Sequence, residues 1–395
     1  MKKIFFLIAA LVVLFSGCAK KELTLTICVW DDYVDAKLVA EFERKYARTI
    51  GEQLSVKVVP FNGYSEALSL LKGGFDCDLI CLTENMVREL RSHNLLQPID
   101  HSLIVPLEAY QPWIIEAMAD ADYKCRFTVP YNYGAMGIAF NTAKLENVHV
   151  ADMQSWSVLW NPKYTGAIQM KRSDYELMSV GLLYLNRDSL LEASDRCTYP
   201  PAYHKELTST LYDYSPEKVN EVMAALREQR QYVMGYFDGT QNRLEFSLNR
   251  GGSIAIMWSC QAANVMDRNR NVEFIIPREG SVLFIDSWAI PAAATHRDAA
   301  YAFLRFMAQP DVARRNMMAK GLPSPIKAVS DAFLQELSHD NGFFAGKTPL
   351  WRRMYFDARF LSKETFKKCC SAKPYSPFHR YLDEQMATFW KEHDN

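Results

Sequence analysis

Apolar residues in this chain follow two alternating spacings, one typical of buried strands and the other typical of amphipathic helices. Compact apolar runs at residues 25–30, 54–59 and 79–82 predict three strands. Each run is followed by a segment, such as residues 34–46, in which apolar positions recur every three or four residues. Strands that alternate with helices predict parallel βαβ units and therefore an α/β fold.

The alternation continues through the rest of the chain without an internal repeat or a low-complexity linker. Further strands are predicted at residues 135–140, 167–170, 253–257 and 272–276. Helices are predicted at residues 65–71, 86–90, 173–185, 216–232, 297–307 and 381–391, with one more beginning at Pro310. Because 395 residues exceed one ordinary hydrophobic core, we expect two domains.

An apolar run at residues 281–291 is broken by a single acidic residue, Asp286. A carboxylate inside a buried strand must be neutralised by a partner. In one interpretation Asp286 caps a turn or pairs with a structural arginine. In the other it binds a ligand at the mouth of a cleft.

The two long apolar strands predict where the chain passes between two lobes. We expect one crossing near residues 135–140 and a second at residues 281–291, with a ligand cleft between the lobes. The expected boundaries are residues 19–138 for the first part of lobe 1, 139–281 for lobe 2, and 282–395 for the second part of lobe 1 with the C-terminal helices. In parallel sheets ligands bind beyond the carboxyl ends of the strands.

Composition and charge narrow the class of protein. The chain is 49% hydrophobic and 23% charged, which is ordinary for a soluble globular protein. A formal net charge of −1 and the lack of a basic stripe argue against a nucleic-acid partner. Aromatic residues make up 13% of the chain, which suits a ring-lined binding cleft as well as a core.

The first 18 residues have the pattern of a bacterial lipoprotein signal. Lys2 and Lys3 precede an apolar stretch, residues 4–15, that is too short to span a bilayer. Ser16, Gly17 and Cys18 then resemble a lipobox, although Phe15 stands where leucine is usual. We therefore expect acylation of Cys18 and a periplasmic or extracytoplasmic protein anchored to a membrane by lipid. The alternative is ordinary secretion with a free Cys18.

Nothing in the sequence predicts catalysis, a metal or another cofactor. The nine cysteines are too scattered for a zinc site or a compact disulfide framework, and Cys28 and Cys81 lie in apolar runs that predict burial. There is no glycine-rich phosphate loop, nucleophile elbow or His-x-x-x-His spacing. Asp31 and Asp32 are adjacent, and neighbouring strand residues face opposite ways, so they make a poor acid–base pair. We expect a protein that is not an enzyme.

Several short segments occur together in an order that points to one family. They are residues 29–33 (VWDDY), 77–80 (CDLI), 129–134 (VPYNYG), 155–160 (SWSVLW), 161–166 (NPKYTG), 256–259 (IMWS), 284–291 (FIDSWAIP) and 310–313 (PDVA). In this order they resemble the spermidine/putrescine-binding proteins of polyamine ABC importers, over the mature chain to about Pro325. The resemblance implies a two-lobed periplasmic-binding-protein fold that closes on a polyamine by a hinge and delivers it to the permease subunits of an importer.

The resemblance also implies roles for individual side chains. Aromatic and hydroxyl positions of the ligand cleft match Trp30, Tyr33, Thr83, Trp258 and Phe284, and acidic positions match Asp32, Glu176 and Asp286. This chemistry suits a polyamine, because carboxylates bind ammonium groups and aromatic faces accept methylenes and add cation–π attraction. Glu84, which follows Thr83, is an extra acid. We hypothesise that Glu84 and the pair Asp31 and Asp32 bind one ammonium group, and that Glu176 and Asp286 bind the others. In the alternative, Glu84 only begins the following helix, where a carboxylate is favoured by about 0.3–1 kcal/mol.

Three positions depart from the family pattern, and they leave the choice of ligand open. Ser173 stands where the family has a carboxylate, with Asp174 next to it. Asn85 and Leu322 stand where the family has tyrosines. The alternatives are a solute-binding lipoprotein for another cation, a thiamine-like molecule or a metal, and a sensory or structural lipoprotein that has lost transport.

Overall fold

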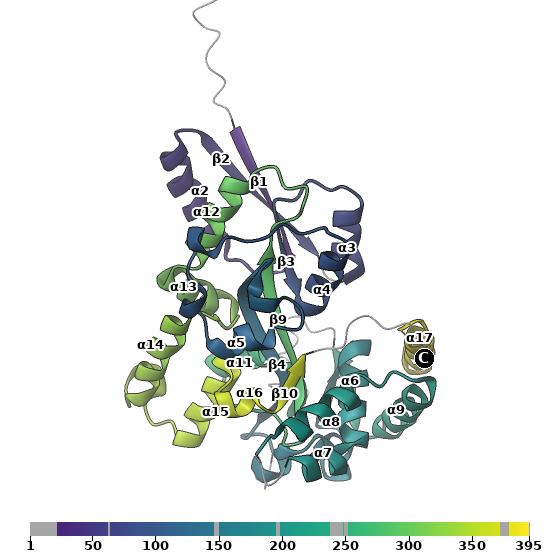
Figure 1. Ribbon diagram of the computed structural model, residues 1–395. Coiled ribbons are helices and arrows are strands. Elements are labelled where there is room, and N and C mark those ends of the chain that lie inside the picture. Colours follow the sequence, from purple (N-terminus) through teal and green to yellow (C-terminus); the bar gives the residue numbers. More distant parts are fainter. Residues whose placement is uncertain are drawn as a thin grey trace, which may run out of the picture.

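The structure, a computed structural model, describes residues 22–61, 64–145, 150–194, 198–237, 248, 252–371 and 379–394 (Figure 1). The predicted signal segment and its Cys18 lie outside these residues. Ten strands in the described part are β1 Glu22–Trp30, β2 Gln53–Phe61, β3 Leu79–Thr83, β4 Thr128–Asn141, β5 Ile168–Lys171, β6 Val233–Phe237, β7 Ile254–Trp258, β8 Val272–Ile275, β9 Ser281–Ala289 and β10 Cys369–Ser371. Their order is β2–β1–β3–β9–β4–β7–β5–β6, with β10 beside β9 and β8 beside β4.

The first lobe contains the parallel strands β2, β1 and β3, as the alternating pattern predicts. Its helices are α2 Ala36–Ile50, α3 Tyr64–Lys72, α4 Glu84–Ser92, α12 Arg297–Met307 and α13 Pro310–Lys320. Leu25 and Ile27 of β1 pack in one core with Phe42 of α2 and Phe303 of α12. Cys28, from the opposite face of β1, packs in a second core that includes residues of α3 and α4. Strand periodicity therefore divides the helices between the two faces.

Strands β4 and β9 run lengthwise between the upper and lower parts of the molecule in Figure 1. Residues 128–135 of β4 pair antiparallel with β9, and residues 136–141 of β4 pair with β7 and β8. Strand β9 also pairs antiparallel with β3. The sequence predicted both long strands, but it did not predict these antiparallel pairings.

The second lobe is built on β5, β6, β7 and β8. Its helices are α6 Asp174–Leu185, α7 Arg187–Ala193, α8 Pro201–Leu211, α9 Pro216–Gln229 and α11 Ser259–Arg268. Helix α6 is buried around most of its circumference, because it packs against α8, α9 and β5. The segment SWSVLW at residues 155–160 contains a short 3-10 helix, Trp156–Trp160, whose apolar side chains are buried.

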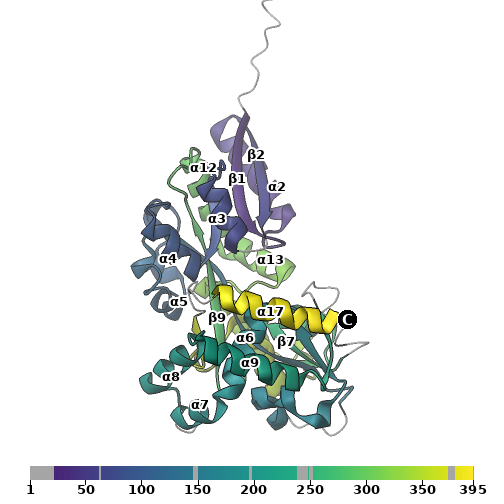
Figure 2. The same ribbon diagram turned by 90° about the vertical axis from the view of Figure 1, so that its right-hand side faces the viewer.

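The C-terminal segment returns to the second lobe. Its helices are α14 Lys327–Ser338, α15 Pro349–Phe360, α16 Lys363–Phe366 and α17 His379–Asp394. Helix α15 packs on α11 and β8, and α17 lies along α9, as Figure 2 shows. Trp390 of α17 donates a hydrogen bond from Nε1 to Oδ1 of Asp174 in α6, at 2.7 Å.

Two findings bear on the expectations about membranes and cysteines. Within the described ranges, no helix has the length and hydropathy needed to cross a bilayer. Cys28 and Cys81 are fully buried, as predicted, and neither forms a disulfide.

Candidate functional site

Asp286 lies in the middle of β9 with 1% of its surface exposed. The hydroxyl of Tyr33 donates a hydrogen bond to its Oδ2 at 2.9 Å. Its Oδ1 has no hydrogen-bond partner among the residues that the structure describes. Burial raises the pKa of this carboxyl far above its ordinary value, and the charge of Glu84 raises it further against the opposing effect of the Tyr33 hydrogen bond. Ionisation of this carboxyl is therefore costly in the protein alone, and a cation placed at the free oxygen would favour the ionised form.

Strand pairing sets polar residues on either side of Asp286. Thr83 of β3 lies opposite Asp286 on one side, and Asn132 of β4 lies opposite it on the other. Directly opposed residues have side chains on the same face of a sheet, so the three form a row across the strands. Asn132 is 1% exposed, and neither polar atom of its side chain has a partner in the described part of the chain. Sequence reasoning missed Asn132, although it lies in the segment VPYNYG.

Residues 30–33, at the end of β1, are divided between the interior and the surface. Trp30 packs on Phe61 with ring centroids 4.7 Å apart, and Tyr33 reaches Asp286. Asp31 and Asp32 are exposed, and Asp32 forms an ion pair with Lys320 of α13. Asp32 also has a φ of 60°, so the chain turns sharply there. The structure thus brings Tyr33, but not the side chain of Asp32, against Asp286.

Glu84 lies at the start of α4 and is 2% exposed. Its Oε2 accepts a hydrogen bond from the backbone N–H of Ile285 in β9, at 2.9 Å. Thr83 precedes it as the N-cap residue, but its side chain makes no capping hydrogen bond. Glu84 therefore ties the beginning of α4 to the strand residue next to Asp286, and its charge lies close enough to act on Asp286.

Aromatic side chains connect β9 with the second lobe. Trp258, at the end of β7, donates a hydrogen bond from Nε1 to Oε1 of Glu176 at 3.0 Å. Its ring meets that of Phe284 edge to face, with centroids 5.1 Å apart. Phe284 lies opposite Gly134 of β4, where an added Cβ would lie 2.7 Å from the phenyl ring. The glycine is therefore needed for this ring position.

Lys171 is a cation of the candidate site that sequence reasoning missed, because the residue types that bind a cationic ligand are acids and aromatics. Its Nζ lies 2.5 Å from Oε1 of Glu176 and 5.9 Å from the centroid of the Trp258 ring. The side chains of Lys171 and Glu176 are 15% and 8% exposed. Ser173 makes no capping hydrogen bond with its side chain, and the neighbouring Asp174 points to Trp390.

Tyr175 and Cys260 are two side chains whose pKa values are influenced by charges from both lobes. Burial raises the pKa of Tyr175 well above its ordinary value, and the charges of Glu84 and Glu176 both add to the effect. Burial likewise raises the pKa of Cys260 to about 11, while Lys171 lowers it and Asp286 raises it. The acids and the lysine therefore belong to one electrostatic neighbourhood.

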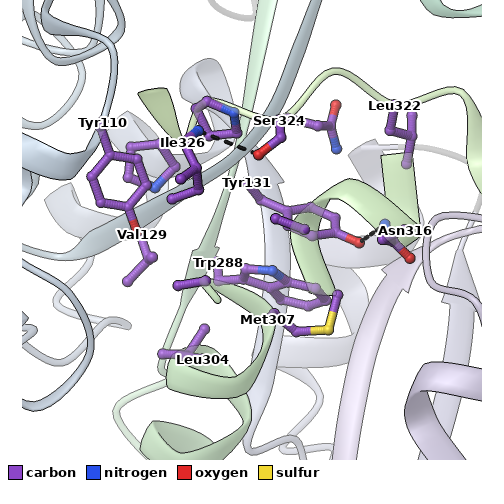
Figure 3. Close-up of a pocket in the computed structure, with 15 residues that line it drawn as sticks. Tyr110, Val129, Tyr131, Trp288, Leu304, Met307, Asn316, Leu322, Ser324 and Ile326 are labelled. Atoms are coloured by element: carbon purple, nitrogen blue, oxygen red, sulfur yellow. Dashed lines mark hydrogen bonds between the residues drawn. The ribbon is translucent and has the colours of Figure 1, made fainter. Parts of the chain in front are cut away.

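An apolar pocket lies beside this site (Figure 3). It has a volume of about 420 Å³, open space at its mouth included. Tyr131 connects the two places, because its hydroxyl donates to the carbonyl oxygen of Tyr33 at 2.8 Å and accepts from Nδ2 of Asn316 at 2.8 Å. The labelled residues in its wall include Tyr131, Trp288, Met307 and Leu322. The departure at Leu322 thus lies in this wall.

Within the part of the chain that the structure covers, no group of three or more His, Cys, Asp or Glu residues is arranged to hold a metal ion. The candidate site consists of carboxylates, a lysine, an amide and aromatic rings. Such a set can bind an organic cation by charge-assisted hydrogen bonds and ring contacts.

Comparison with known proteins gives a consistent result. A family model for bacterial extracellular solute-binding proteins matches residues 37–345. The chain is 26% identical over 302 residues to the putrescine-binding periplasmic protein PotF of Escherichia coli, covering 74% of this chain and 75% of the relative. It is 22% identical over 351 residues to the spermidine/putrescine-binding periplasmic protein of Salmonella typhimurium, covering 87% of this chain and 91% of the relative.

A solved structure shares the fold. The spermidine/putrescine ABC transporter substrate-binding protein PotD of Streptococcus pneumoniae matches with a TM-score of 0.68 at 21% identity, covering 93% of this chain and 98% of that protein. The similarity confirms the predicted two-lobed periplasmic-binding-protein architecture.

Proposed function

This chain belongs to the family of bacterial extracellular solute-binding proteins, and on that premise we propose that it captures a polyamine between its lobes and delivers it to an ABC importer. The observation that carries the proposal is the buried carboxylate of Asp286, with one oxygen held by Tyr33 and the other without a partner among the described residues. A buried carboxylate without a counter-charge is costly, and an ammonium group would remove that cost.

The surrounding side chains support a ligand made of ammonium groups and methylenes. The rings of Phe284 and Trp258 are in edge-to-face contact. Phe284 lies two residues before Asp286 in β9, and Trp258 donates a hydrogen bond to Glu176. Each ring contact with a cation contributes about 0.5–2 kcal/mol. We assign Asp286 and Glu84 to the first-lobe side of the ligand. We place Trp30 and Thr83 as supporting residues there, with Asp31 and Asp32 at the exposed rim.

We also propose the division of the chain into moving parts. Lobe 2 comprises residues 139–281, and residues 19–138 and 282–395 supply lobe 1 and the C-terminal helices. Strands β4 and β9 would serve as the hinge, because they pair with each other and continue into both lobes. The role of the protein is to bind and hand over a solute to permease subunits, without catalysis.

The function is tested by isothermal titration of the purified protein with putrescine, spermidine and spermine, with thiamine as a different cation, and with glucose as an unrelated solute. At least one polyamine is expected to give saturable binding that glucose does not give. Binding of thiamine with no binding of any polyamine would assign the site to a different cation. A protein that binds none of these would point to a structural or sensory lipoprotein.

Anchoring through Cys18 is a separate proposal, which rests on the sequence pattern of residues 1–18. Cys18→Ser removes the thiol that would be acylated, so the variant is expected to lose fatty-acid labelling and to move from the membrane fraction to the soluble fraction. Metabolic labelling and fractionation of cells measure both effects. Unchanged membrane partitioning of the serine variant would refute lipidation at this residue.

A further inference from the structure

We propose that the ammonium group of Lys171 occupies a place that a ligand ammonium would otherwise fill, so that the site accepts diamines in preference to longer polyamines. The inference rests on the proposed polyamine function and concerns the number of cationic groups in the ligand. Its starting point is the contact of Lys171 with Glu176, at the second-lobe end of the site.

One carboxylate oxygen of Glu176 already accepts two hydrogen bonds within the protein. Oε1 of Glu176 accepts from Nζ of Lys171 at 2.5 Å and from Nε1 of Trp258 at 3.0 Å. The lysine ammonium also lies 5.9 Å from the Trp258 ring centroid, within the range of a cation–π contact. A carboxylate and an aromatic ring are the two contacts that a polyamine ammonium would need, and Lys171 has both.

The ion pair of Lys171 and Glu176 is largely shielded from water. The side chain of Lys171 is only 15% exposed and that of Glu176 only 8%, so water screens this pair poorly. A second ammonium group brought to the same carboxylate would meet a like charge at short range in a medium of reduced dielectric constant. The third cation of spermidine and the fourth of spermine are therefore disfavoured at this end.

In the described part of the chain, no second carboxylate is turned toward the ammonium of Lys171. Ser173 supplies no charge, and Asp174 points to the indole of Trp390 in the C-terminal helix α17. Asp32, at the first-lobe rim, is paired with Lys320. On the first-lobe side, Asp286 and Glu84 remain close enough for the charge of one to act on the other. The cationic groups of a diamine can be attracted to this side without approaching Lys171.

The test compares the affinities for putrescine and spermidine in the wild type and in three variants by isothermal titration. Lys171→Gln removes the charge at the site. Lys171→Arg keeps the charge and is the matched control. Lys163→Gln removes a lysine that pairs with Asp152 on the surface of the same lobe, 3.1 Å away, and controls for net charge.

The wild type is expected to bind putrescine more tightly than spermidine. In Lys171→Gln the affinity for spermidine should rise at least about tenfold relative to putrescine, because Glu176 becomes available to the third ammonium group. Lys171→Arg and Lys163→Gln should keep the wild-type ratio.

Two results overturn the inference while polyamine binding itself stands. One is a wild type that binds spermidine as tightly as putrescine, and the other is a ratio that Lys171→Gln leaves unchanged. Should the glutamine variant fail to fold, the wild-type ratio decides the matter, because equal binding of spermidine and putrescine overturns the inference. Absence of binding of either polyamine to the wild type and to every variant would instead overturn the proposed function.

Discussion

Replacing Asp286 with asparagine is expected to weaken polyamine binding more than a hundredfold while the ligand-free protein stays as stable as the wild type or becomes more stable. Removing one partner of a buried charge pair costs about 3–5 kcal/mol, and each 1.4 kcal/mol is about tenfold in affinity. In the ligand-free protein the same carboxylate is a cost, because it is 1% exposed and its described partner is the neutral hydroxyl of Tyr33.

The pH dependence of stability provides a second measurement on the same residue. In the unfolded chain an aspartate releases its proton near pH 3.9. In the folded, ligand-free protein, burial holds the pKa of Asp286 well above that value. The folded state therefore keeps a proton that the unfolded state has lost, and the free energy of unfolding falls as the pH rises through this interval. Asp286→Asn removes the titrating group, so this part of the pH dependence should disappear.

Titration calorimetry measures the affinity, and thermal melts across the pH range measure the stability. Glu84→Gln is a second variant for comparison. The charge of Glu84 raises the pKa of Asp286, and its Oε2 accepts a hydrogen bond from the backbone N–H of Ile285. A smaller loss, about tenfold, is expected for this variant. An Asp286→Asn protein that binds polyamines normally, or one that no longer folds, would assign Asp286 to structure.

Replacing Asp267 with asparagine is expected to have the opposite pattern, a loss of about 3–5 kcal/mol in the free energy of unfolding with no change in polyamine affinity. Asp267 of α11 forms an ion pair with Arg359 of α15, whose side chain is fully buried. Arg359 also donates to the hydroxyl of Tyr355 at 3.4 Å and to Oδ1 of Asn264 at 3.5 Å. The asparagine variant would leave this guanidinium buried without its counter-charge.

Urea denaturation of the ligand-free proteins checks the loss of stability. Glu336→Gln is the matched control, because it breaks the exposed pair of Glu336 with Arg314, 2.9 Å apart. An exposed pair of this kind contributes about 0–1 kcal/mol. We infer that the pair of Asp267 and Arg359 stabilises the packing of α15 on α11. An Asp267→Asn protein destabilised no more than the control would contradict this inference.

The sequence by itself determined the local elements and the kind of fold. Strand β1, helix α2 and helix α12 occur where apolar spacing predicts them, because burial of one face is a local, periodic property. The ordered segments predicted the two-lobed architecture that the comparison with PotD confirms. The sequence also singled out Asp286, since a lone carboxylate within an apolar strand is visible without any structure.

Only the tertiary structure decided which side chains meet. Asp31, Asp32 and Tyr33 are neighbours in the chain, yet only Tyr33 reaches Asp286, because the turn at Asp32 directs the acids outward. Asn132 lies beside Asp286 through an antiparallel strand pairing that no local pattern predicts. Lys171 meets Glu176 of helix α6 and the ring of Trp258 at the end of strand β7. Such contacts depend on side-chain direction and on strand register, which are set by the packing of segments far apart in the chain.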